Sequence, residues 1–168
     1  MTRMKTLFRT LTASLALALV VATAGLFSVP ARAASLTDFL ETALINHLFR
    51  GTAYTAPANW HISLHTAACS DSATGTEVTG GSYARVAVAS GAGTWAAVSA
   101  GNGTTSNSAA VNFATPSAGW GLVTHFGLWD ATTAGNQLIC QALTTSKTIN
   151  SGDTVSFAIG ALTIQIDN

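Results

Sequence analysis

The chain has 168 residues with seven basic and seven acidic side chains, and only 8% of its residues are charged while 48% are hydrophobic. A chain of this length forms one domain by the usual prior and is long enough to bury a core. Its low charge and apolar content exclude the composition that is typical of disordered proteins.

The amino-terminal residues form a pattern that is typical of an export signal. Three basic residues within the first ten precede an almost wholly apolar run, residues 15–29, and a small-x-small cleavage site ends at Ala33. The run is shorter than the roughly 20 residues that cross a bilayer core, which favours a cleaved signal over a transmembrane anchor. We therefore expect a signal peptide over residues 1–33 and a secreted, single β-rich domain over residues 34–168, without a membrane span.

Cleavage at this site would change the charge balance of the protein. Four of the seven basic residues lie within the signal, whereas all seven acidic residues lie beyond it, which leaves a net charge of 3 − 7 = −4 with neutral histidines. The remaining cations, Arg50, Arg85 and Lys147, are too few and too scattered to replace the counterions of a phosphate backbone, so nucleic acid is not an expected partner. A surface of small neutral residues instead favours self-association.

An amphipathic helix is predicted over residues 35–50. Ser35 can cap the first free amides, and Gly51 follows the segment as a stop signal. Apolar residues recur along it at three- and four-residue spacing, namely Leu36, Phe39, Leu40, Ala43, Leu44 and Leu48. Ile45 and Phe49 widen this stripe beyond what one flat contact needs. The helix is therefore expected either to lie between a sheet and another element or to face a neighbouring subunit.

From Trp60 onward the apolar residues alternate with polar ones, as in a half-buried strand. Trp60, Ile62 and Leu64 follow this rule, and further short runs lie at residues 83–89, 109–113, 122–129, 137–143, 154–159 and 162–166. Turns rich in Gly and Asn separate the runs. The pattern predicts a mainly β fold over residues 60–168: an antiparallel β-sandwich, or a barrel-like sheet, of about 7–9 short strands. Residues 91–108 are interpreted as a long loop or an irregular edge.

Cys69 and Cys140 are the only cysteines of the chain. After export both would enter an oxidising compartment, where a single disulfide is the economical interpretation. The bond would close a loop of about 70 residues and contribute on the order of 4 kcal/mol to stability. The alternative is a buried free thiol at each position.

The sequence predicts no catalytic, metal or cofactor site. His61 and His65 would share one face of a strand but lie some 13 Å apart, too far for one metal ion, and His47 and His125 could complete a site only through tertiary contacts. A serine hydrolase with His125 and Asp130 is a weak alternative because no G-x-S-x-G elbow occurs beyond the leader. A glycosidase with two carboxylates is also weak, because the seven acids mostly occupy inferred caps, turns and the terminus.

The tryptophans divide into two pairs. Trp60 and Trp129 lie in apolar strand patterns and are predicted to be core residues, whereas Trp95 and Trp120 lie beside Gly-rich segments and could form an exposed aromatic face. The predicted interaction surface joins the latter pair to the helix and consists of Leu36, Phe39, Leu40, Ile45, Phe49, Trp95 and Trp120.

Several strings of the sequence resemble one known family, in order along the chain. They include SLTDFLETALINHLFRG over residues 35–51, GTEVTGGSYAR over residues 75–85, THFGLWDA over residues 124–131 and LTTSKTINSGDTVSF over residues 143–157. They are similar to small bacteriophage virion proteins that are labelled tail-fibre or minor structural proteins. The resemblance implies a non-enzymatic β-rich module with an amino-terminal helix that assembles on or into a larger particle, and it supplies no catalytic residues.

Two features depart from this resemblance. Virion proteins of this kind usually lack an export signal, and Cys69 and Cys140 are not part of the family pattern. The expected function is a secreted structural subunit that self-associates into a surface or fibre-like assembly. The alternative is an extracellular module that binds carbohydrate, such as a cell-surface glycan, or another surface, and a small secreted hydrolase ranks third.

Overall fold

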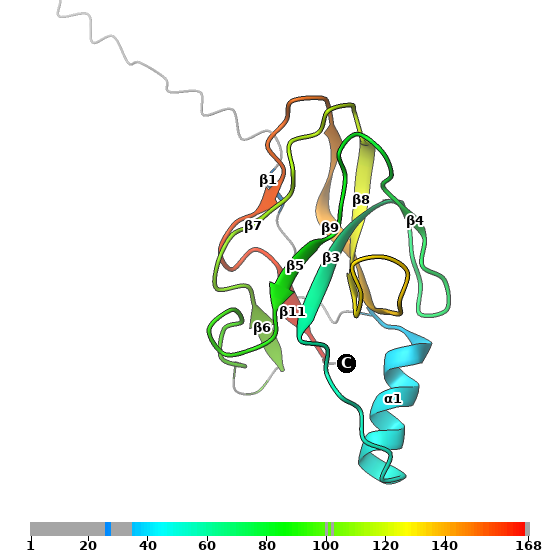
Figure 1. Ribbon diagram of the computed structural model, residues 1–168. Coiled ribbons are helices and arrows are strands. Elements are labelled where there is room, and N and C mark those ends of the chain that lie inside the picture. Colours follow the sequence, from blue (N-terminus) through cyan, green and yellow to red (C-terminus); the bar gives the residue numbers. More distant parts are fainter. Residues whose placement is uncertain (1–25, 28–34, 100, 102, 167–168) are drawn as a thin grey trace, which may run out of the picture.

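A computed structural model describes residues 26–27, 35–99, 101 and 103–166, which form a β body with one helix projecting from it (Figure 1). The predicted signal peptide and its cleavage site lie outside the described residues, except for β1 (Leu26–Phe27). Within the described part, no helix is both long and apolar enough to span a membrane.

The larger layer is a six-stranded antiparallel sheet, here called the main sheet. Its strands run in the order β2 (Ser35–Leu36), β9 (Gln137–Ile149), β8 (Gly121–Trp129), β3 (Asn59–Ala67) and β4 (Thr76–Glu77), and β5 (Val86–Ala89) also pairs with β3. Its long central strands β3, β8 and β9 contain the predicted runs that begin at Trp60 and span residues 122–129 and 137–143, and β9 continues beyond its predicted run to Ile149. Alternation places Ile62, Leu64, Phe126 and Leu128 on one face, because Ile62 is paired with Leu128 and Leu64 with Phe126.

The second layer consists of two small sheets. In one, β10 (Ser156–Phe157) lies between β1, which it pairs in parallel, and β7 (Val111–Asn112). In the other, β11 (Thr163–Gln165) pairs with β6 (Thr104–Ser106). The layers meet where the Phe126 ring contacts the Phe157 ring, with centroids 5.7 Å apart. The predicted antiparallel sandwich is therefore confirmed, and the barrel-like alternative is not, because the sheets do not close.

The core between the layers is made of aliphatic and aromatic side chains. The fully buried ones include Ile62, Leu64, Val123, Phe126, Leu138, Ile149, Val155, Phe157 and Leu162. Each buried side chain of this size contributes about 1.5–3 kcal/mol relative to leaving it in water. Because they come from both layers, the two layers share one core.

Two local expectations need correction. Ser35 does not cap the helix, since Ser35 and Leu36 pair with β9 and α1 spans Asp38–Phe49. Thr37 precedes the helix, but its hydroxyl donates to the Gln137 carbonyl instead of capping an amide. Residues 91–108 are not wholly irregular, because they contain β6 and a bridge between Trp95 and Asn107.

The helix ends as the sequence predicts. The Arg50 amide donates to the Asn46 carbonyl, and Gly51 then adopts a left-handed conformation with φ 70°. A residue with a Cβ adopts this conformation only at a cost, so Gly51 is a structural stop signal.

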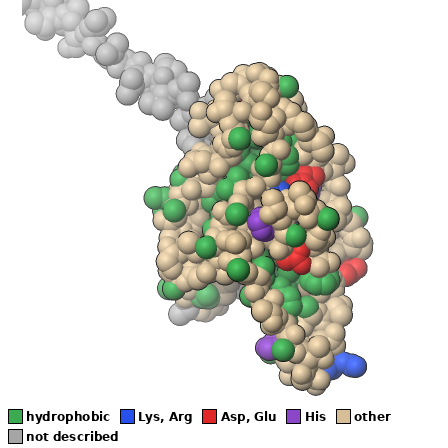
Figure 2. Space-filling view, viewed as in Figure 1, with side chains coloured by type: hydrophobic (Ala, Val, Ile, Leu, Met, Phe, Trp, Pro, Cys, Tyr) green, Lys and Arg blue, Asp and Glu red, His purple; other side chains and the backbone are tan. Residues whose placement is uncertain are grey.

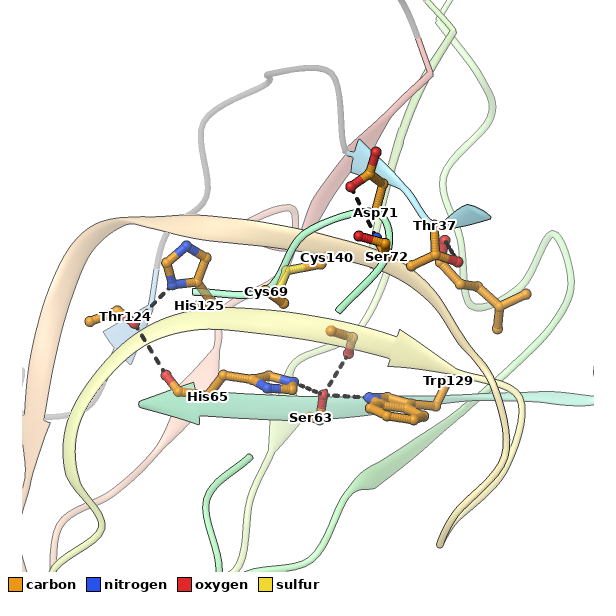
Figure 3. The surroundings of a disulfide bond; sticks show 12 residues. Thr37, Ser63, His65, Cys69, Asp71, Ser72, Thr124, His125, Trp129 and Cys140 are labelled. Atoms are coloured by element: carbon orange, nitrogen blue, oxygen red, sulfur yellow. Dashed lines mark hydrogen bonds between the residues drawn. A yellow bond between two sulfur atoms is a disulfide. The ribbon is translucent and has the colours of Figure 1, made fainter. Parts of the chain in front are cut away.

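The predicted disulfide between Cys69 and Cys140 is confirmed (Figure 3). Their Cα atoms lie 6.1 Å apart, and 71 positions separate them in the sequence. The bond ties the segment after β3 to the first part of β9, and β8 lies between these two strands in the sheet.

Candidate interaction surface

Large exposed apolar side chains are concentrated on the helix α1. It rests on the β body through its amino-terminal half and projects beyond it (Figure 1). Leu40 is 5% exposed and belongs to the core, whereas Ile45, Leu48 and Phe49 are 54%, 69% and 78% exposed. One side of α1 is therefore docked and another is open.

Helical geometry explains this division. At about 100° per residue, Leu40 and Leu44 lie on the same side, and Leu48, Ile45 and Phe49 occupy an arc of roughly 100° that begins beside Leu44 and turns away from it. Leu44 is half-buried and packs against the core. The second apolar arc is the widened stripe of the sequence, and nothing in the described chain covers it.

The predicted interaction surface is thus only partly exposed. Phe39, Ile45 and Phe49 lie on the exposed surface of α1. Leu36 is half-buried and packs against the core. Leu40 must be removed from the surface, because it is the residue through which the helix docks.

The prediction of an exposed Trp120 was wrong. Its side chain is 5% exposed, its ring contacts the Tyr83 ring edge-on at 5.3 Å, and its indole N–H donates to the Gly81 carbonyl at 3.0 Å. Gly81 permits this approach, since a Cβ there would lie 3.0 Å from Nε1 of the indole. Gly81 thus lets the backbone of a distant segment cover the Trp120 ring.

The other tryptophans follow their predictions more closely. Trp129 is 6% exposed and Trp60 packs against the core, as expected for strand residues. Trp95 is half-buried, and its indole N–H donates to the Ala89 carbonyl at 3.2 Å. Trp95 is therefore the one tryptophan of the predicted surface that keeps part of its ring in solvent.

A charged cluster that sequence reasoning missed lies at the edge of the main sheet. Arg85 donates to Glu77 through two hydrogen bonds of 2.9 and 2.7 Å, and its guanidinium carbon lies 3.6 Å from the centroid of the Trp129 ring. It also donates to the carbonyls of Ala131 and Ala134. The side chain of Arg85 is 7% exposed, and its guanidinium group makes its hydrogen bonds within the protein. The sequence held one signal for this pair: Arg85 is one of few basic residues, and it follows Glu77 by eight positions.

Tyr83 completes the cluster, and its hydroxyl bonds to β3 where no neighbouring strand does so. The strand β3 pairs with β5 up to Ile62 and with β4 from His65 onward. Between these pairings, the hydroxyl of Tyr83 accepts from the Leu64 amide at 2.8 Å and donates to Glu77 at 2.9 Å. Burial, supported by the nearby Glu77 carboxylate, raises the pKa of Tyr83, so the hydroxyl stays protonated.

A second polar cluster lies on the face of the main sheet that carries the disulfide. Oγ of Ser63 lies 2.7 Å from Nε2 of His65 and accepts from the indole N–H of Trp129 at 2.8 Å (Figure 3). Ser63 and His65 are both 0% exposed. The pair has the spacing of a nucleophile and its base, but solvent does not reach it.

The histidines do not form a metal site in the described chain. No group of three or more His, Cys, Asp or Glu side chains that could hold a metal ion occurs among the residues that the structure describes. Burial, opposed by the nearby Glu77 carboxylate, lowers the pKa of His65 to about 4. Burial also lowers the pKa values of His61 and His125. All three imidazoles therefore favour the neutral form.

The described residues line two hollows that bear on the charged cluster and on the start of α1. One of about 290 Å³ is lined by Glu77, Arg85 and the segment 132–134, and its charged groups already bind each other. The other, of about 280 Å³, lies between the start of α1 and the segment 70–74. Charged side chains are sparse across the face shown in Figure 2, which is mostly neutral.

The sequence was compared with known proteins. The model of one protein family, described as Podophage GP4 fiber I protein gp80, matches residues 35–165. No curated protein matches the sequence. The matched range begins at β2 and ends with β11, so it contains α1 and strands of both layers.

Proposed function

Because the chain belongs to the family of the podophage GP4 fiber I protein gp80, we propose that it is a non-enzymatic structural subunit that self-associates into a fibre-like assembly. The family match agrees with the resemblance to phage fibre and minor structural proteins. The observation that carries the proposal is the extent of the match, which includes the helix and both layers of the sandwich.

The chemistry of the described residues supports a structural role. Ser63 and His65, the pair that most resembles a catalytic one, are sealed from solvent. Arg85 and Glu77, the charged pair beside a surface hollow, satisfy one another and the nearby backbone. Large apolar side chains of α1 are exposed instead, and exposed apolar patches mark contact surfaces.

Self-association is tested on the purified protein by multi-angle light scattering over a wide concentration range, followed by negative-stain imaging. We expect the mass to rise above that of one chain as concentration increases, because apolar surface is buried in the assembly. A protein that stays strictly monomeric at the highest concentration contradicts the proposal.

Export is a separate part of the proposal. The basic start, the apolar run and the site at Ala33 support secretion through a cleaved signal peptide. Intact mass and amino-terminal sequencing of protein recovered outside the producing cells should give a chain that begins at Ala34. A chain that retains Met1 would show that the leader is not removed.

The carbohydrate-binding alternative loses support from the positions of its two tryptophans. Trp120 is buried, and the indole N–H of Trp95 is already bonded to a backbone carbonyl. An aromatic platform for a sugar ring needs exposed rings, so the geometry favours assembly over glycan binding.

A further inference from the structure

We propose that residues 68–74, here called the cover, are held closed over the polar face of the main sheet by the Cys69–Cys140 bond and open when this bond is reduced. The cover is therefore a redox-sensitive device built into the fold. This inference goes beyond the proposed function and does not depend on self-association, because it concerns the conformation of a single chain.

The first argument is the position of the bond in the main sheet. Cys140 of β9 pairs with Gly127 of β8, and Gly127 pairs with Ser63 of β3, so the three residues form one row across the central strands. Residues directly opposite one another share a face, so the side chains of Cys140 and Ser63 lie on the same face. Because β8 lies between β3 and β9, the cover must cross β8 after β3 to bring Cys69 to Cys140 (Figure 3).

The second argument is the polar cluster at the point where the cover crosses β8. Three polar atoms lie within 3.0 Å of the position that a Cβ on Gly127 would occupy. They are Nε2 of Gln137, Oγ of Ser63 and Nε2 of His65. Because Gly127 has no side chain, polar groups from β3 and from β9 meet above β8. Ser63 and His65 are 0% exposed and Gln137 is 4% exposed, so this cluster is buried.

The third argument is that some polar atoms of this cluster have no partner while the cover is closed. Nδ1 of His65 and both polar atoms of the Gln137 amide are buried and make no hydrogen bond with any described residue. A buried polar atom without a partner destabilises the folded state, because it has lost its hydrogen bond to water. Opening of the cover lets water reach these atoms, so the closed state needs a tether.

The fourth argument is that the disulfide is the main attachment of the cover. The Ser70 amide donates to the Ala73 carbonyl, and this hydrogen bond lies within the cover itself. The Ser72 amide donates to the Asp71 carboxylate, which is also within the cover. Among the described residues, one hydrogen bond joins the cover to a distant element, from the Asp38 amide of α1 to the Asp71 carbonyl. Reduction of the disulfide therefore leaves the cover weakly held between β3 and β4.

The proposed export would place the cover in two states, one on each side of the membrane. Disulfides are rare in the reducing cytoplasm and persist in oxidising compartments. The cover is therefore open before export and closes afterwards. This consequence rests on the proposed export, whereas the experiment below uses purified protein in both redox states and does not depend on it.

The experiment measures how fast diethyl pyrocarbonate modifies each histidine of the purified whole protein, followed by peptide mass mapping. His65 lies beneath the cover, and His47, which is exposed on α1, is the internal control. Reduction should raise the rate of modification at His65 at least about tenfold, because local opening exposes the ring, and should change the rate at His47 less than about twofold. An unchanged rate at His65 overturns the proposal.

Hydrogen exchange distinguishes local opening from unfolding. On reduction the Asp38 amide, which is bonded to the cover, should lose protection, whereas the amides of Phe113 and Trp120, which bond to backbone carbonyls of the sandwich, should keep theirs. The double variant Cys69→Ser and Cys140→Ser should behave like the reduced protein without any reductant. Loss of protection at all three amides means that the whole fold opens, and this outcome also overturns the proposal.

The Gln137→Met variant tests what opposes the closed state. It removes both unpaired amide atoms and keeps a side chain of similar length, so the cover should stay closed more often after reduction. The gain in rate at His65 should then fall below about threefold. Gln165→Met, in β11 of the second layer, is the matched control and should leave the gain unchanged. A full gain in Gln137→Met overturns the role assigned to the Gln137 amide.

Discussion

The hydroxyl of Tyr83 is an example of a side chain that replaces backbone in a sheet. It bridges the Leu64 amide and Glu77 at the point where β3 changes partner from β5 to β4. Tyr83→Phe should lower the free energy of unfolding by about 1–3 kcal/mol, because a buried amide loses its acceptor. Urea denaturation followed by tryptophan fluorescence measures this loss.

Tyr54→Phe is the matched control for that prediction. The hydroxyl of Tyr54 is buried but makes no hydrogen bond with any described residue. Removing it should therefore change stability by less than about 0.5 kcal/mol or increase it slightly. Equal losses for the two variants would show that the Tyr83 hydroxyl does not act as a strand partner.

His65 makes the stability of the fold depend on pH. Its pKa is about 4 in the folded protein and about 6.5 in the unfolded chain, because burial disfavours the charged ring. Between these values the unfolded chain binds the extra proton, so stability is full above about pH 6.5 and falls as the pH drops towards 4. The loss from His65 alone is roughly 3 kcal/mol, measured by urea denaturation at pH 7 and pH 4.

A variant isolates this effect from other titrating groups. His61 and His125 have lowered pKa values as well and contribute with the same sign. His65→Gln removes only the largest contribution, so the difference in unfolding free energy between pH 7 and pH 4 should shrink by about 2–3 kcal/mol. An unchanged difference would mean that His65 is protonated in the folded protein at pH 4 without cost.

At the scale of elements, the disulfide restrains the segment between β3 and β4. It closes a loop over a sequence separation of 71, which on the chain-entropy account stabilises the fold by on the order of 4 kcal/mol. The double variant Cys69→Ser and Cys140→Ser should lose about that much in urea denaturation. Reduction of the unfolded parent should add the mass of two hydrogens, and an unchanged mass would contradict the bond.

The elements that the sequence predicted best are those with a strong internal pattern. In β3 apolar and polar residues alternate from Trp60 to His65, and the helix ends at Gly51, where the backbone turns left-handed. The start of the helix could not be predicted, because Ser35 and Thr37 bond to β9, a segment about one hundred residues away. Local capping rules predict the wrong start of the helix where residues distant in sequence bind the same backbone and side-chain groups.

The candidate site shows the same limit. The widened stripe of α1 is visible in the sequence, so Ile45 and Phe49 were included in the predicted interaction surface, and both are exposed. The burial of Trp120 depends on Gly81, 39 positions earlier, and no local pattern shows that contact. The bonds from Arg85 to Glu77 and to the segment 131–134 are likewise set by the register of β3 with its neighbours.

At the scale of the whole molecule, the bonded polar clusters around Arg85 and Ser63 are largely buried, whereas large apolar side chains of α1 are exposed. The charged pair Arg85 and Glu77 joins the sheet edge to the loop of residues 131–134, and His65, whose pKa is lowered furthest among the histidines, lies in a buried cluster. This distribution suits a subunit whose exterior makes contacts, since a neutral surface costs little to desolvate.

The shared core predicts that the molecule unfolds as one unit. Leu40 of α1, Phe126 of the main sheet, and Phe157 and Ile164 of the second layer all belong to one cluster of buried residues. Loss of either layer exposes the apolar face of the other, so neither should persist alone. Thermal unfolding of dilute protein should therefore give coincident transitions by far-ultraviolet circular dichroism, which follows the backbone, and by fluorescence of the buried indoles of Trp120 and Trp129. Two separated transitions would show that helix and sandwich, or the two layers, unfold independently.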